Sequence, residues 1–188
     1  MIKPIGGTIF YIDPNADGQY KLYDKDRKET DKIKDAVYYE KTVDGTMDKY
    51  YVVDSKTKFV YPVVWSFVDK LIGVTYTEIG FGRQNTEIAL NTADSSDQYA
   101  EYSMWKKLTE NNEKSVGGCN DWYIGSRDEV DKLILSGLIK DWKTNKGNIL
   151  CSSERYHPDL VWCWIGKKKL WYREIKSMDG AVCFIRSF

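Results

Sequence analysis

The chain has 188 residues, enough for one domain with a sizeable core, and 42% of them are hydrophobic. Its 28 basic residues balance its 28 acidic residues, so no global field draws it to nucleic acid or to an anionic membrane. No apolar run approaches the roughly 20 residues of a membrane-spanning helix. The first residues lack the apolar stretch of a signal peptide, so secretion by that route would require a leader removed from this chain. We expect one globular domain over 1–188, with no nucleic-acid partner and no membrane insertion.

The first third of the chain is rich in predicted strands. Residues 8–12 form a short apolar run that ends in a turn signal at 13–15. Residues 38–39 and 50–53 indicate two strands joined through a turn, and residues 58–65 indicate a third. Because the charges of this stretch nearly balance, we interpret residues 18–61 as a β-rich, exposed hairpin insertion and not as a second domain.

Helices are expected next, at 85–91 and at 95–109. In the second of these, Tyr99, Tyr102, Trp105 and Leu108 recur at intervals of three and predict an aromatic stripe that packs on the core. A binding groove is the alternative interpretation of that stripe.

A further helix begins at Ser126, where Ser126 and Glu129 form a capping-box pattern. Its expected buried side comprises Val130, Leu133, Ile134, Leu135 and Leu138. Strands are predicted again at 160–165, 170–175 and 181–185. Strands at both ends of the chain with helices between them indicate an α+β fold whose terminal strands meet in one antiparallel sheet.

Three blocks resemble a known family, in that family's own order. Residues 79–86 (IGFGRQNT) resemble its segment before the first helix, and residues 117–130 (GGCNDWYIGSRDEV) resemble its "GGxxDWYLPSxxEL" segment. Ser152-Ser153-Glu154, a Trp-bearing strand and the ending at 185–188 resemble its "SSE…W…VRPVRxF" tail. The family is a bacterial and phage group of C-type-lectin-fold domains. It includes the variable proteins of diversity-generating retroelements and is related in fold to formylglycine-generating enzymes.

The resemblance covers about residues 5–13 and 79–188 and implies a particular architecture. It implies two main helices packed on an antiparallel sheet, with the N- and C-terminal strands adjacent, so that residues 8–12 lie in the same antiparallel sheet as 181–185. Gly125, where the family commonly has Pro, and Cys183-Phe184 depart from its pattern. Independently of the family, we expect Trp122 to be a core anchor. We also expect Ser152 and Ser153 to pin a loop through side-chain to backbone hydrogen bonds.

Catalytic and metal chemistry find little support in the sequence. His157, the only histidine, lies in a predicted loop and is a better candidate for a contact residue than for a catalytic base. The kinship with formylglycine-generating enzymes leaves a copper site at Cys163 and Cys183, expected on adjacent strands, as an alternative without a supporting motif. Calcium signatures of animal C-type lectins are absent. We predict no enzyme activity, no cofactor and no metal.

The four cysteines, at 119, 151, 163 and 183, include no C-x-x-C pair and suit no zinc site. We interpret them as buried free thiols, with one or two disulfides as the alternative.

We interpret the segment 151–188 as a cationic surface, because it carries seven basic and four acidic residues and three of the seven tryptophans. In a strand over 160–165, Trp162 and Trp164 lie on one face, and Val161, Cys163 and Ile165 on the other. Tryptophan beside cationic residues is typical of an interface hot spot. The alternative is that both tryptophans belong to the core and that the insertion covers the opposite face.

In retroelement-diversified members of the family, the side chains between the "SSE" block and the tail line an exposed binding face. The resemblance therefore implies a non-enzymatic protein that recognises a protein or glycan ligand on another cell or surface, itself on a virion or cell surface. A structural adhesin or surface-fibre domain is the alternative. The candidate ligand-binding residues are Arg155, Tyr156, His157, Asp159, Trp162, Trp164, Lys168, Trp171, Tyr172 and Arg173.

Overall fold

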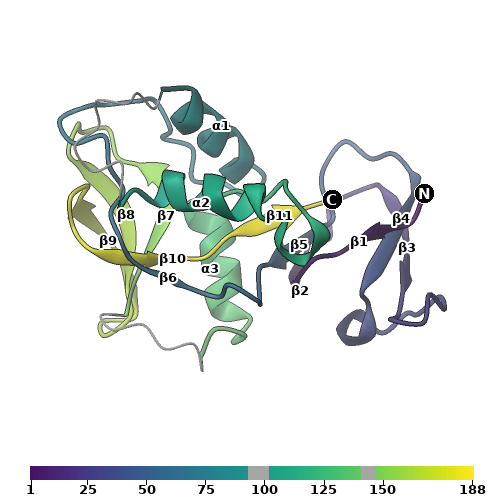
Figure 1. Cartoon of the computed structure of the whole chain (residues 1–188). Helices are drawn as coiled ribbons and strands as arrows, with labels where there is room; N and C mark the ends of the chain where they lie inside the picture. The colour runs from purple at the N-terminus through teal and green to yellow at the C-terminus, as the bar shows by residue number, and fades with distance from the viewer. Residues whose placement is uncertain (93–101, 141–146) are drawn as a thin grey trace.

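The structure is a computed structural model that describes residues 1–92, 102–140 and 147–188. It is an α+β fold, as the sequence predicts (Figure 1). Three sheets and three α-helices make up the described part of the chain. The helices are α1 (Gly82–Thr92), α2 (Met104–Glu113) and α3 (Arg127–Leu135).

The largest sheet has five strands in the order β6-β10-β7-β8-β9. All neighbours are antiparallel except the parallel pair β10 and β7. The predicted strands at 160–165 and 170–175 are confirmed with those bounds. The strands are β6 (Val60–Val63), β7 (Asn148–Glu154), β8 (Leu160–Ile165), β9 (Leu170–Ile175) and β10 (Gly180–Val182).

Helices cover both faces of this sheet. Leu150 faces a core cluster with Ala89 of α1 and with Trp105 of α2. Its neighbour Ile149 points the other way, into a second cluster with Leu133 of α3. Because alternate residues of a strand point to opposite faces, the sheet lies between α1 and α2 on one side and α3 on the other.

A second sheet has the order β11-β5-β2, with β2 (Thr8–Ile12), β5 (Tyr50–Val53) and β11 (Ile185–Ser187). Residues 8–12 and Ile185 share this antiparallel sheet, as expected, but the expected adjacency of the two strands is wrong. Both β2 and β11 pair with β5, which lies between them.

The predicted strand 181–185 is in fact divided between two sheets. Residues up to Val182 belong to β10 in the five-stranded sheet, and Ile185 begins β11 in the second sheet. Cys183 and Phe184 connect the two, and both are buried.

A third sheet, β1-β4-β3, stands at one end of the molecule beside both chain ends (Figure 1). It contains β1 (Lys3–Pro4), β3 (Gln19–Tyr23) and β4 (Tyr38–Val43), with the short 3-10 helix η1 (Ile33–Asp35) between the last two. The expected pairing of residues 38–39 with 50–53 is wrong, because β4 pairs with β1 and β3 whereas β5 pairs with β2 and β11. The expectation of an exposed hairpin is wrong for β5, all of whose residues are buried.

The helix predictions hold in part. The capping box of α3 is confirmed, with Ser126 and Glu129 bonded reciprocally. Of the expected buried side, Val130 and Leu133 are buried, whereas Leu135 is 72% exposed because α3 ends there.

The expected helix over 95–109 begins only at Met104 within the described part of the chain. Residues 95–101, including Tyr99, lie outside the described residues. Trp105 and Leu108 are buried, whereas Tyr102 is exposed.

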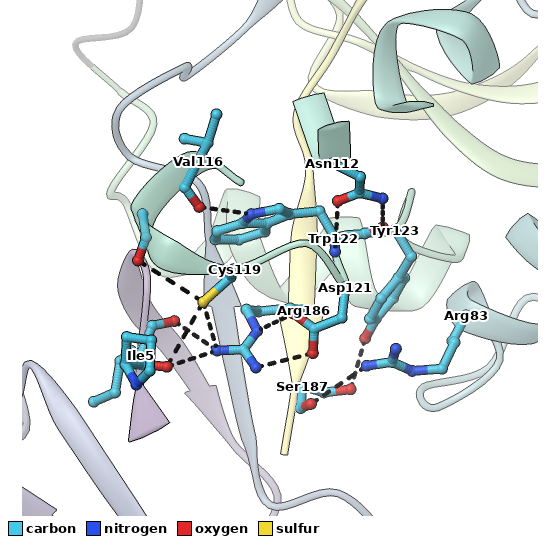
Figure 2. Close-up of polar contacts among 12 residues, drawn as sticks. Ile5, Arg83, Asn112, Val116, Cys119, Asp121, Trp122, Tyr123, Arg186 and Ser187 are labelled. Carbon is cyan, nitrogen blue, oxygen red and sulfur yellow. Dashed lines mark hydrogen bonds and ion pairs between the residues drawn. The ribbon is translucent and has the colours of Figure 1, made fainter. Parts of the chain in front are cut away.

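Arg186 ties the C-terminal strand to the N-terminal segment (Figure 2). Its Nη1 donates to the carbonyls of Pro4 and Ile5 at 2.9 and 3.0 Å, and its Nη2 donates to Asp121 Oδ2 at 2.9 Å. Trp122 is the core anchor expected from the sequence, with its Nε1 donating to the Val116 carbonyl at 3.0 Å. A short 3-10 helix, η2 (Val116–Gly118), precedes this cluster.

Candidate functional site

A pocket of about 550 Å³ lies where the loop after β7 meets the start of α3 and the segment 75–78. It brings together five of the ten candidate residues, namely Arg155, Tyr156, His157, Trp162 and Arg173. Thr75, Thr77, Glu78, Arg127, Glu154 and Leu160 complete its lining. We call it the arginine pocket, after Arg127, Arg155 and Arg173.

The indole of Trp162 forms the floor on which two guanidinium groups stack. The guanidinium carbon of Arg155 lies 4.4 Å from its ring centroid, and that of Arg127 lies 5.0 Å from it. Arg173 is the cross-strand partner of Trp162 and therefore shares its face of the sheet. Cation–π contacts of this kind hold flexible arginine side chains in place.

The polar block at the end of β7 fixes the walls of the pocket. Ser153 Oγ donates to the Tyr76 carbonyl at 2.7 Å and accepts from the Arg127 N–H at 3.1 Å. Asn85 Nδ2 donates to Ser152 Oγ at 3.3 Å. The expected side-chain to backbone hydrogen bonds are confirmed for Ser153, whereas Ser152 Oγ accepts from the Asn85 side chain. The expectation that they pin the loop after β7 is wrong, because Ser153 holds the segment at Tyr76 and the start of α3.

Glu154 and Lys176 form a buried ion pair beneath the pocket. Their side chains are fully buried, and Lys176 Nζ lies 2.9 Å from Glu154 Oε2. Glu154 Oε1 also accepts from the backbone N–H groups of Ile72, Gly73 and Val74, at 3.0, 2.5 and 3.1 Å. Burial lowers the pKa of Lys176, which the carboxylate opposes.

Two basic residues counted toward a cationic surface are therefore internal. Lys176 is inside the protein beside Glu154, and Arg186 is 5% exposed. The interpretation of all seven basic residues as surface charge is wrong for these two, because each is held by buried carbonyl and carboxylate oxygens.

The other tryptophans of the hairpin pack beneath α3. Val161 and Cys163 are buried on the opposite face, so the predicted alternation along β8 is confirmed. Trp164 and Trp171 are half-buried, 5.9 Å apart in an edge-to-face arrangement, and Trp171 Nε1 donates to Asp131 Oδ1 at 2.9 Å. These two side chains therefore join the sheet to the helix.

The remaining candidates lie outside the pocket. Tyr172 pairs with Cys163 and is on the face opposite the tryptophans, where Lys168 lies 5.7 Å from its ring centroid. Asp159 Oδ1 accepts from the Asp69 N–H at 2.9 Å, and this hydrogen bond lowers the pKa of the Asp159 carboxyl. Asp159 thus anchors the neighbouring segment 66–74.

Arg127 is the lining residue that the sequence interpretation missed. It occupies the first turn of α3, where the helix dipole disfavours a positive charge, and Asp128 offsets it at 2.8 Å. An arginine in the first turn of a predicted helix is the sequence signal that points to Arg127. Thr75, Thr77 and Glu78 have no comparable signal, since only folding brings them to the pocket.

The four cysteines are free and buried. Cys163 belongs to the cluster on the α2 side of the sheet, and Cys183 to the cluster on the α3 side. The expectation that these two lie on adjacent strands is wrong, because β7 separates β8 from β10. Burial raises the pKa of Cys183 to about 12, so this thiol stays protonated at neutral pH.

A larger hollow, of about 980 Å³, lies between β3 and residues 24–37. Its four lysines are matched by four acidic residues, so it has no net preference for charge. Among the described residues, no group of three or more metal-ligating side chains occurs, and no helix has the length and apolar character to cross a membrane.

The arginine pocket is thus the place where cationic, aromatic and hydroxyl side chains converge. Such a set can hold and orient a ligand through ion pairs, hydrogen bonds and stacking. Comparison of the chain with protein-family models, with curated proteins and with solved structures gave no match.

Proposed function

We propose that this chain is a non-enzymatic recognition protein with a C-type-lectin-like fold, whose binding surface centres on the arginine pocket. The convergence of Arg155, Tyr156, Trp162 and Arg173 on one hollow carries the proposal. Tyr, Trp and Arg are the residue types that dominate binding energy at protein interfaces. The three sequence blocks support kinship with retroelement-diversified proteins of a virion or cell surface, which recognise a protein or glycan.

The test screens the immobilised chain against a random dodecapeptide library and a glycan array. Recovered ligands are titrated against Tyr156→Ala and Tyr172→Ala. Tyr156 is 87% exposed at the pocket, and Tyr172 is 48% exposed on the opposite face, so both changes spare the core. We expect Tyr156→Ala to weaken binding at least tenfold, because an exposed aromatic at an interface centre contributes about 1–2 kcal/mol or more.

Tyr172→Ala is the matched control and should change affinity less than twofold. Equal binding by both variants, or the recovery of no ligand at all, would contradict the proposed function.

A structural adhesin or surface-fibre domain is the second candidate, and one observation favours it. Strand β9 is at the edge of the five-stranded sheet and exposes Leu170, Tyr172 and Ile175. An exposed apolar edge strand can pair with another chain. Sedimentation of the purified chain at increasing concentration tests this: growth into open-ended oligomers supports assembly, and a constant mass excludes it.

A further inference from the structure

The arginine pocket holds positive charge that no described residue of the protein neutralises. Arg127 is paired with Asp128, but Arg155 and Arg173 have no carboxylate within 4.0 Å among the described residues. The whole chain has equal numbers of basic and acidic residues, so this excess is local. A hollow lined with unpaired positive charge concentrates anions.

The acidic residues of the pocket are already engaged elsewhere. Glu154 is fully occupied by Lys176 and three backbone N–H groups. Glu78 Oε2 accepts the N–H of Thr77 at 2.9 Å. Neither carboxylate neutralises Arg155 or Arg173, which stay available for an external partner.

We propose that the arginine pocket binds the carboxylate side chains of an acidic peptide segment of a partner protein, an inference that rests on the proposed function. The planar guanidinium fork matches a carboxylate with two parallel hydrogen bonds. Arg155 stacks on the Trp162 indole and Arg173 is the cross-strand neighbour of Trp162, so the two guanidinium groups can receive successive acidic side chains of one segment.

A peptide suits this pocket better than an acidic glycan. Sugars bind proteins by stacking on open aromatic faces, but the Trp162 ring already carries the guanidinium groups of Arg127 and Arg155. The exposed ring of Tyr156 and the two free arginines instead have the composition of a protein-binding hot spot.

The test measures fluorescence anisotropy of a labelled hexaglutamate peptide, with hexaglutamine as the neutral match. Hexaglutamate should bind at least tenfold more tightly than hexaglutamine, and its affinity should fall with salt. Arg155→Gln and Arg173→Gln should each weaken it about tenfold, whereas Arg155→Lys, which keeps the charge but loses the fork, should weaken it about threefold. Arg27→Gln, in the exposed turn after β3, removes the same charge far from the pocket and should have no effect.

Three results would overturn the inference. The first is equal loss in Arg27→Gln and Arg155→Gln, which means nonspecific attraction. The second is a heparin-derived hexasaccharide that binds through the same arginines as tightly as hexaglutamate, which means a general anion site. The third is a set of library peptides that depend on Tyr156 but carry no acidic excess. This last result is consistent with the proposed function. A lack of any Tyr156-dependent ligand, by contrast, would contradict both the proposed function and the acidic-peptide inference.

Discussion

Glu129 shows how much one buried carboxyl group controls at the start of α3. Its Oε2 accepts from the Ser126 N–H at 2.8 Å, and its Oε1 accepts from the Gly80 N–H at 2.9 Å. Complete burial nevertheless raises its pKa to about 7. The Tyr123 hydroxyl donates to Ser187 Oγ at 3.0 Å and lies 3.5 Å from Glu129 Oε1, so it compensates little for the burial of that carboxyl group.

A raised pKa in the folded state makes stability fall as the pH rises. Glu129 binds its proton more tightly in the folded chain, so the free energy of unfolding should decrease from pH 4.5 to pH 7, by on the order of 3 kcal/mol. Urea unfolding at closely spaced pH values measures this slope.

The glutamine of Glu129→Gln cannot titrate, so the free energy of unfolding of this variant should change less between pH 4.5 and pH 7. It should also be less stable than the native chain at pH 5, by about 1–3 kcal/mol, because its amide group meets a backbone donor. An equal slope in the two proteins would show that another group titrates there.

At the scale of elements, the pair Glu154 and Lys176 fixes the segment 66–74. Ser66, Phe67 and Asp69 have positive φ angles in this segment, which are costly for residues other than glycine. Glu154 compensates by accepting three of its N–H groups, and Lys176 donates to the Lys70 carbonyl. The ion pair therefore holds a backbone that would not keep this shape alone.

Removing one partner of a buried ion pair leaves an uncompensated charge. Lys176→Met should lower the free energy of unfolding by about 3–5 kcal/mol, and Glu154→Gln should speed hydrogen exchange at the amides of Ile72, Gly73 and Val74. The control is Lys107→Met, which breaks the partly exposed pair with Glu110 and should cost less than about 1 kcal/mol. Equal costs in the two Lys→Met variants would refute a structural role for the buried pair.

Local sequence signals correctly predicted those elements whose formation depends on residues within the element itself. The capping box located α3, and alternation located β8 and its buried face. The apolar run at 181–185 predicts one strand, because an apolar run does not reveal that its two halves pair with different sheets. For β5, the unbroken apolar run over 50–53 was itself a sign of a strand covered on both faces.

The candidate site was also predictable only in part. The block at 152–154 and the tryptophan alternation led to Arg155, Tyr156 and Trp162, all of which line the pocket. That α3 covers Trp164 and Trp171 follows from packing between distant elements, which periodicity cannot show. The contributions of Arg127 and of residues 75–78 have the same origin.

At the scale of the whole molecule, Phe188 joins the terminal β1-β4-β3 sheet to the rest. Its ring stacks on Tyr39 with centroids 3.7 Å apart and contacts Tyr20 and Tyr50 at 5.6 and 5.4 Å. Its carbonyl accepts the N–H groups of Lys49 and Tyr50. One buried side chain thus packs against strands of two sheets.

Phe188→Ala should destabilise the protein by about 3–5 kcal/mol, because the aromatic cluster cannot close over the lost ring. We expect near-UV and far-UV circular dichroism to report the same lowered melting temperature, since the sheets share this contact. The control is Tyr102→Ala, which removes a 54% exposed aromatic side chain and should change the melting temperature little. If the near-UV signal alone is lost at lower temperature, the terminal sheet melts independently.

The central place of β5 also governs when this protein can fold. About 130 residues separate Val53 from its partner Ile185, so one side of β5 stays unpaired until this distant strand has been synthesised. During translation, Tyr50–Val53 is an apolar edge open to other nascent chains. Completion of the sheet therefore comes late in synthesis, and expression yield should depend on chaperone supply more than the stability of the finished fold suggests.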